Sequence, residues 1–255
     1  MASPRRVRPS AAKVVVRRAR DRFVSTDDGL VSQHSFSFGQ HYDPDNVGFG
    51  LLVMSNDDVI QPGHGYPTHA HRDVEVVTWV LEGALVHQDS TGHSGIVRPG
   101  LVQRMSAGRG VQHAEFNDAP GRAGPLRFVQ MWVPPDTPGT DPAYAQADVA
   151  AELGGGGLVA VASGLARHQD AAISIGQRSA AFHVAQPAAG TAVELPGAPF
   201  VHVYVARGEV DVEGVGRLGE GDAARMTDEG GRRVRAVSDA EILVWEMHAG
   251  VGPPR

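Results

Sequence analysis

The sequence predicts an all-β protein that consists of two tandem, jelly-roll-like β-barrels. A chain of 255 residues can hold two domains of about 110–120 residues each. Short runs of alternating β-branched and aromatic residues are broken by Gly, Pro, Asn and Asp, and such regular spacing is typical of sandwiches and barrels. The segments EGALV at 82–86 and RGEVD at 207–211 occupy comparable places in the two halves, which favours two related barrels.

The first barrel is expected to span residues 18–135. Its strands are predicted where apolar and polar residues alternate, and Pro134-Pro135 is expected to end it. The Asn-Asp-Asp sequence at 56–58 is interpreted as a turn. The predicted strands cover residues 35–38, 49–54, 75–81, 84–88, 102–106 and 126–133, together with the segment around 113–115.

The second barrel is expected to span residues 158–250 and to follow a linker at 136–157. A weak helical pattern within this linker covers residues 143–153. The strands predicted for the second barrel cover residues 181–184, 191–195, 201–205, 209–212, 234–236 and 242–247.

Composition limits the classes of protein that the chain can represent. It has no cysteine, so disulfides and thiolate ligands are excluded and any metal must be bound by N and O atoms. No stretch approaches the roughly 18 apolar residues of a membrane span, and the first residues lack the apolar segment of a signal peptide. We therefore expect a cytoplasmic protein without membrane association.

Charge is distributed unevenly along the chain. Residues 1–22 contain seven Arg and one Lys against a single acidic residue, Asp21, whereas the whole chain has a net charge of −6. An acidic body argues against a nucleic-acid surface, although a protein partner is compatible with it. Residues 1–17 are interpreted as a basic tail that is partly disordered and includes an Arg-rich edge strand.

Two short motifs predict a metal site. In a strand, residues i and i+2 point to the same face about 6.6 Å apart, so His69-Ala70-His71 and His113-Ala114-Glu115 can each project both ligands into one cavity. Three imidazoles and one carboxylate suit a divalent metal such as Fe(II), Mn, Ni or Cu, with positions left open for a substrate or O₂.

Longer stretches around these motifs resemble a known family. The segment GHGYPTHAHRDVE at 63–75 resembles the first cupin motif, and GVQH at 110–113 followed by Asn117 resembles the end of the second. Four longer segments together resemble the pirin family of bicupins: HAHRDVEVVTWVLEGALVHQDSTGHSG, MSAGRGVQHAEFN, HSFSFGQHYDP and DAEILVWEM. The similarity runs from about Arg18 to Met247, so it covers nearly the whole chain.

The resemblance implies a bicupin whose first barrel holds the metal and whose second barrel does not. The implied ligands are His69, His71, His113 and Glu115. Fe(II) is the implied metal, with Mn, Ni, Co, Cu or Zn as alternatives. The general cupin pattern would instead make Glu75 a ligand. We favour Glu115, and we interpret Glu75 as a nearby hydrogen-bond acceptor or an exposed strand residue.

The resemblance also implies quercetin 2,3-dioxygenase activity. In that reaction a small aromatic substrate, a flavonol, reacts with O₂, and its heterocycle is cleaved with loss of carbon monoxide. A metal-bound hydroxyl has a lowered pKa, and Glu115 is the candidate general base because a carboxylate at the metal is within hydrogen-bond reach. The alternatives are a metal-binding regulatory protein without turnover and another metal-dependent cupin enzyme, such as an isomerase of a small polar substrate.

The remaining histidines are given other roles. His34 and His41 could line the pocket or lie on a surface loop, His64 could reach the cavity rim, and His87 and His93 are interpreted as structural. No second metal site is expected, because the histidines of the second half form no H-x-H or H-x-E motif: His168, His183, His202 and His248.

Overall fold

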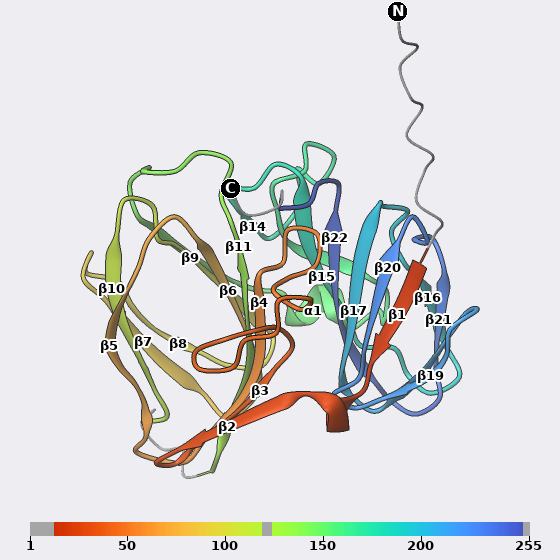
Figure 1. Cartoon of the computed structure of the whole chain (residues 1–255), viewed down its shortest axis with the longest axis horizontal. Coiled ribbons are helices and arrows are strands. Elements are labelled where there is room, and N and C mark those ends of the chain that lie inside the picture. Colours follow the sequence, from red (N-terminus) through yellow and green to blue (C-terminus); the bar gives the residue numbers. More distant parts are fainter. Residues whose placement is uncertain (1–12, 119–123, 252–255) are drawn as a thin grey trace, which may run out of the picture.

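The computed structural model describes residues 13–118 and 124–251. Two β-barrels lie side by side, and the first half of the chain forms one barrel while most of the second half forms the other (Figure 1). The all-β, two-barrel fold predicted from the sequence is confirmed. Among the described residues, no helix has the length and apolar character needed to cross a membrane.

The first barrel consists of a seven-stranded and a four-stranded antiparallel sheet. The order of the large sheet is β12-β9-β6-β11-β4-β3-β2, and that of the small sheet is β5-β10-β7-β8. The strands are β2 (Phe23–Asp27), β3 (Leu30–His34), β4 (Met54–Ile60), β5 (Gly65–His71), β6 (Glu75–Glu82), β7 (Leu85–Asp89), β8 (Ser94–Val97), β9 (Leu101–Ser106), β10 (Val111–Phe116), β11 (Leu126–Val133) and β12 (Ala143–Asp148).

The second barrel repeats this order in its small sheet and in the inner strands of its large sheet, whereas the edge strands β1 and β14 come from other places along the chain. Its large sheet runs β1-β20-β17-β22-β15-β13-β14 and its small sheet β16-β21-β18-β19. Only the β13–β14 pair is parallel among the described strands. The elements are β1 (Lys13–Arg17), η1 (Ala19–Asp21), α1 (Ala150–Leu153), β13 (Val159–Ser163), β14 (Ile173–Ser174), β15 (Ala180–Ala185), β16 (Ala192–Glu194), β17 (Phe200–Arg207), β18 (Glu209–Val212), β19 (Gly216–Gly219), β20 (Ala223–Thr227), β21 (Arg233–Ala236) and β22 (Glu241–Met247).

Each barrel receives an edge strand from outside its expected boundaries. Residues 143–148, where a helical pattern was expected, form β12 and pair with β9 of the first barrel. The helical interpretation was wrong there because the small Ala residues also fit a strand, in which Ala145 and Ala147 pack against the core. The basic segment ends in β1, which pairs with β20 of the second barrel, and residues 1–12 lie outside the described part.

Three local predictions in the first barrel were also wrong. Residues 56–58 are not a turn but the middle of β4. Residues 35–38 lie in an irregular segment, and of residues 49–54 only Met54 belongs to a strand. Acidic residues are tolerated inside β4 because they have partners: Asp57 pairs with Arg127 at 2.8 Å, and Asp58 accepts a hydrogen bond from Tyr66 at 3.1 Å.

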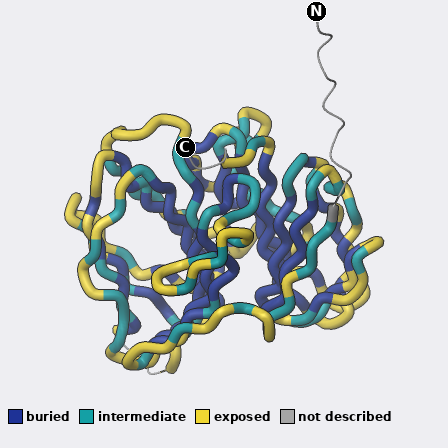
Figure 2. Tube along the Cα trace, viewed as in Figure 1, coloured by how far each residue is buried: buried dark blue, intermediate teal, exposed yellow. Residues whose placement is uncertain are grey.

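The interiors of the two barrels differ. The largest apolar cluster lies between the two large sheets and includes Trp79 and Trp245. A second apolar cluster fills the second barrel with Val, Ala, Leu, Ile and Met side chains. The first barrel has only smaller apolar clusters, and buried polar side chains lie on its strands, among them Gln103, His113 and Glu115 (buried segments are dark blue in Figure 2). The interior of the first barrel is therefore the more polar of the two barrel interiors.

Candidate metal centre

Two neighbouring strands of the small sheet carry the four residues of the predicted site. β5 supplies His69 and His71, and β10 supplies His113 and Glu115. The strands are antiparallel, with His69 opposite His113, and a bulge lies between His113 and Glu115. His113 and Glu115 are buried, whereas His69 and His71 are half-buried at the rim.

The three imidazoles converge. The Nε2 atoms of His69 and His113 lie 3.0 Å apart, and the three ring centroids are separated by 4.4 to 4.8 Å. The Nε2 atom of His71 is buried and has no hydrogen-bond partner among the described residues. A buried polar atom without a partner is costly, and ligand atoms at such spacings can surround a cation with bonds of about 2.0–2.2 Å. The residues therefore fit a divalent metal.

The protonation states of the rings also suit a cation. His69 donates its Nδ1 proton to the Pro67 carbonyl at 2.8 Å, which leaves the Nε2 lone pair free. Burial, together with the neighbouring rings of His69 and His71, lowers the pKa of His113 to about 2. Burial likewise lowers the pKa of His71 to about 4. His71 and His113 are therefore unprotonated at neutral pH, as a metal ligand must be.

Glu115 lies beside this group rather than at its centre. A carboxylate oxygen of Glu115 and ring nitrogens of His113 and His87 all lie within 4.8 Å of one another. His69, His71 and His113 form a separate group by the same measure. Gln130 on β11 donates from Nε2 to both carboxylate oxygens, at 3.0 and 2.9 Å. The pKa of Glu115 is raised to about 7, mainly by burial. The Asp58 carboxylate also raises it, whereas the hydrogen bonds from Gln130 oppose the shift.

Gln130 is a site residue that the sequence analysis missed. Its own Oε1 accepts a hydrogen bond from Nε1 of Trp132 at 3.2 Å. The Trp132 ring packs edge-on against His71, with 4.9 Å between centroids. The only indication of this role in the sequence is that Gln130 and Trp132 lie two positions apart on one predicted strand and so share a face.

His87 was interpreted as structural, but it lies next to the imidazole cluster. It is fully buried on β7, and its Nδ1 atom lies 3.5 Å from Nδ1 of His113 and 3.2 Å from the amide of Gln103. Its Nε2 atom faces Asp89 at 3.5 Å. The sequence could have indicated this position, because Leu85, His87 and Asp89 lie at every second place along one strand and so share a face.

Glu75 makes its contacts away from the imidazoles. It is 3% exposed, which excludes the exposed alternative, and it accepts a hydrogen bond from Ser106 at 2.8 Å. Its carboxylate belongs to none of the His-containing groups found among the described residues.

The other histidines of the first half lie outside the cluster. His34 bonds to Asn56 at 3.1 Å, and together with His41 it lines a different pocket. His64 is half-exposed near Asp28, at 3.9 Å. His93 is exposed, stacks on Tyr144 and lies 3.3 Å from Asp89.

A second group of histidines forms in the second barrel, although the sequence shows no paired motif there. His168 and His183 lie near Glu246, with 3.0 Å between His183 and the carboxylate. His248 lies 2.7 Å from the other carboxylate oxygen. Arg167 forms an ion pair with Glu246, so the carboxylate charge is already neutralised.

Two tandem barrels whose inner strands follow the same order, with an H-x-H and an H-x-E strand in the first, define a bicupin. The family model described as "Pirin" matches residues 15–133. A second family model, described as "Quercetinase C-terminal cupin domain", matches residues 160–247. The chain belongs to the pirin family of cupins.

Similar proteins span the chain almost completely. A Mycobacterium tuberculosis H37Rv protein named "Putative quercetin 2,3-dioxygenase Rv0181c" is 52% identical over 94% of this chain and 98% of its own length. The quercetin 2,3-dioxygenase of Escherichia coli K12 is 35% identical over 92% of this chain and 98% of its own length. The crystal structure of the E. coli pirin YhhW in complex with nickel(II) superposes with a TM-score of 0.83 at 31% identity, covering 93% of this chain and all of that one.

Proposed function

We propose that this protein is a metal-dependent dioxygenase that cleaves the heterocycle of a quercetin-type flavonol with O₂. The observation that carries the proposal is the convergence of three imidazoles, one of which has a buried Nε2 atom that meets no hydrogen-bond partner in the described parts of the chain. His69, His71 and His113 would hold the metal, and Glu115 would be the fourth ligand. Fe(II) is the metal we favour; a relative is described with nickel(II).

The relatives support the reaction class. The E. coli K12 relative is named quercetin 2,3-dioxygenase, which requires a flavonol and O₂ as the small-molecule partners. When bound, the divalent metal would act as a Lewis acid that lowers the pKa of a coordinated hydroxyl and provides an open position beside the substrate.

The chain's own residues would do the proton chemistry. Glu115 accepts the proton of the flavonol 3-hydroxyl, because a carboxylate at the metal is within hydrogen-bond reach of a coordinated hydroxyl. Gln130 holds both carboxylate oxygens and so fixes the orientation of the base. Trp132 packs on His71 and restrains that ring.

The test is aerobic turnover of quercetin, followed by its absorbance, with protein whose content of Fe, Mn, Ni, Co or Cu has been measured. We expect His69→Ala/His71→Ala to lose both metal and turnover. Glu115→Gln should keep part of the metal and lose about 100-fold in kcat, because a general base contributes on the order of 10²–10⁴. His93→Ala, an exposed imidazole of the same barrel, is the matched control.

Absence of turnover at full occupancy with each of these metals would contradict the proposal and favour a regulatory role for the metal site. Equal rates for the wild type and Glu115→Gln would remove Glu115 as the base while leaving the metal site intact.

A further inference from the structure

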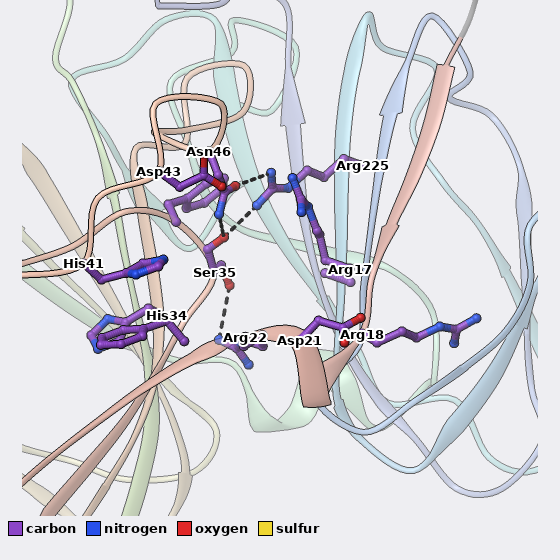
Figure 3. Close-up of a pocket in the computed structure, with 13 residues that line it drawn as sticks. Arg17, Arg18, Asp21, Arg22, His34, Ser35, His41, Asp43, Asn46 and Arg225 are labelled. Atoms are coloured by element: carbon purple, nitrogen blue, oxygen red, sulfur yellow. Dashed lines mark hydrogen bonds between the residues drawn. The ribbon is translucent and has the colours of Figure 1, made fainter.

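A pocket outside the imidazole cluster lies where the N-terminal segment crosses from the second barrel to the first (Figure 3). Residues 17–23, the loop at 34–46 and strand β20 line it, and its volume is about 180 Å³. In Figure 3, Arg17, Arg22 and Arg225 approach the loop that carries Ser35 and Asn46. The pocket therefore combines three guanidinium groups from separate elements.

Arg225 is the most deeply buried of these arginines. It is 5% exposed, and it donates to the Ser35 carbonyl at 2.8 Å and to Oδ1 of Asn46 at 2.7 Å, which are both neutral acceptors. Its guanidinium lies over the Phe36 ring, 4.3 Å from the centroid. Its Nε atom is buried without a hydrogen-bond partner in the described part of the chain.

Arg22 shares part of this pattern, although the Tyr204 hydroxyl that it contacts in turn donates to the Asp57 carboxylate. Its guanidinium donates to the Gln33 carbonyl at 2.6 Å, to Oγ of Ser35 at 3.2 Å and to the Tyr204 hydroxyl at 3.0 Å. Its Nε atom is also buried without a partner in residues 13–118 and 124–251.

No carboxylate among the described residues lies within 4.0 Å of the guanidinium groups of Arg17, Arg22 or Arg225. The two carboxylates that line the pocket have other contacts: Asp21 lies 3.8 Å from Arg20, and Asp43 accepts the backbone N–H of Asp45. Arg18, which also lines the pocket, is paired with Asp222 at 2.7 Å.

Buried charges in proteins are normally paired, because an unpaired charge in a low-dielectric environment is costly. Burial, followed by the charges of Arg17 and Arg22, lowers the pKa of Arg225 to about 10. An anionic ligand would add a counter-charge and could accept charge-assisted hydrogen bonds from the exposed guanidinium of Arg17.

We propose that this pocket binds a small aromatic anion, namely a single ring that carries a carboxylate or phosphate group. The volume is close to that of an engineered cavity of roughly 150 Å³ that binds benzene. Aromatic walls are present as well, since Phe23 and His41 stack with 4.2 Å between centroids and Phe36 lies beneath Arg225. This site does not depend on the metal centre or on the dioxygenase activity.

The test is isothermal titration of the metal-loaded full chain with phenyl phosphate, benzoate and phenol at low ionic strength. We expect one saturable site for phenyl phosphate or benzoate, no measurable binding of phenol, and weaker binding as salt increases. The tighter of the two anions identifies the headgroup. Arg17→Gln should weaken binding at least tenfold, and because Arg17 is exposed this variant should fold.

Three further variants locate the site. Arg225→Gln should abolish binding, whereas Arg233→Gln, an exposed arginine of the second barrel, should leave it unchanged. His69→Ala/His71→Ala should also retain binding. The proposal is overturned if neither anion binds, if phenol binds as tightly, or if binding survives Arg17→Gln and disappears in the double histidine variant.

Discussion

Gln130 shows how a single residue prepares the candidate base. A buried carboxylate without donors would be held in its protonated form, and Gln130 supplies an amide group to both oxygens of Glu115. Its other end is fixed by Trp132, which packs on His71. One side chain thus links the base to a wall of the imidazole cluster.

Gln130→Leu tests this role. The variant keeps a side chain of similar volume but removes the amide, so we expect kcat for quercetin to fall about tenfold while the metal content per chain stays within error of the wild type. Gln146→Leu on β12 is the matched control. A variant that loses metal and turnover in proportion would show that Gln130 only supports the fold of the site.

His202 provides a prediction for stability rather than for catalysis. It is 1% exposed, and its Nε2 atom has no partner in the described chain. Burial, with Arg225 and Arg22 nearby, lowers its pKa to about 3. Because the unfolded chain titrates near 6.5, the unfolded state binds more protons between pH 6.5 and 3, so stability is lost as the pH falls through that window.

We expect His202 to account for about 2 kcal/mol of the stability lost between pH 6.5 and 4.5. Urea unfolding of His202→Phe at several pH values should therefore show a shallower pH dependence, whatever its absolute stability. His93→Gln should leave the wild-type slope unchanged. Identical slopes for the wild type and His202→Phe would contradict this account.

At the scale of single residues, the sequence was informative where the chemistry is local. The H-x-H and H-x-E motifs lie within single strands, so their spacing alone predicts a shared face, and the structure brings the three imidazoles together. Gln130 and His87 could not be predicted in the same way, because they reach Glu115 and His113 only through the pairing of other strands.

At the scale of elements, the close approach of β5 to β10 positions the ligands. Gly65 begins β5, and a Cβ added there would lie 2.2 Å from the Glu115 carbonyl oxygen. Such a contact cannot form without moving one strand away from the other, and both strands carry ligands. The glycine therefore sets the distance across which the imidazoles meet.

Gly65→Ala should reduce metal affinity by about tenfold or more while the circular dichroism spectrum remains that of a β-protein. Gly219→Ala is the control, since a Cβ there meets no atom within 4 Å and the site lies on β19 of the second barrel. Competition with a metal-binding dye measures both variants. Unchanged affinity in Gly65→Ala would mean that β5 can shift without disturbing the cluster.

The elements that sequence reasoning missed share one physical cause. Residues 56–58 form part of a strand because Arg127 and Tyr66 from other strands pair with their carboxylates. Residues 143–148 form a strand because β9 offers an open edge. Both outcomes depend on partners far along the chain, whereas strands with strong alternation, such as residues 126–133, were predicted at their observed bounds.

At the scale of the whole molecule, the two barrels share their largest apolar core. Trp79 of the first barrel donates a hydrogen bond to Glu241 of the second at 2.6 Å, and Trp245 of the second lies against Met131 of the first. Apolar area buried between domains contributes roughly 25 cal/mol per Å². A barrel separated from its partner would expose this core to water.

We therefore expect the chain to unfold in one cooperative transition by calorimetry. Trp245→Ala should lower the midpoint of that single transition, because removing a buried tryptophan costs about 3–5 kcal/mol. The contrary result would be two resolved transitions in the wild type, only one of which shifts in Trp245→Ala. That result would show that the barrels unfold independently.

The most direct measurement of the central claim is the anomalous diffraction of Fe(II)-loaded crystals at the iron edge. The account predicts one iron per chain in the first barrel, bound by Nε2 atoms of His69, His71 and His113 at about 2.0–2.2 Å. Full iron occupancy at another position, or no iron among these three imidazoles in fully loaded protein, would contradict it.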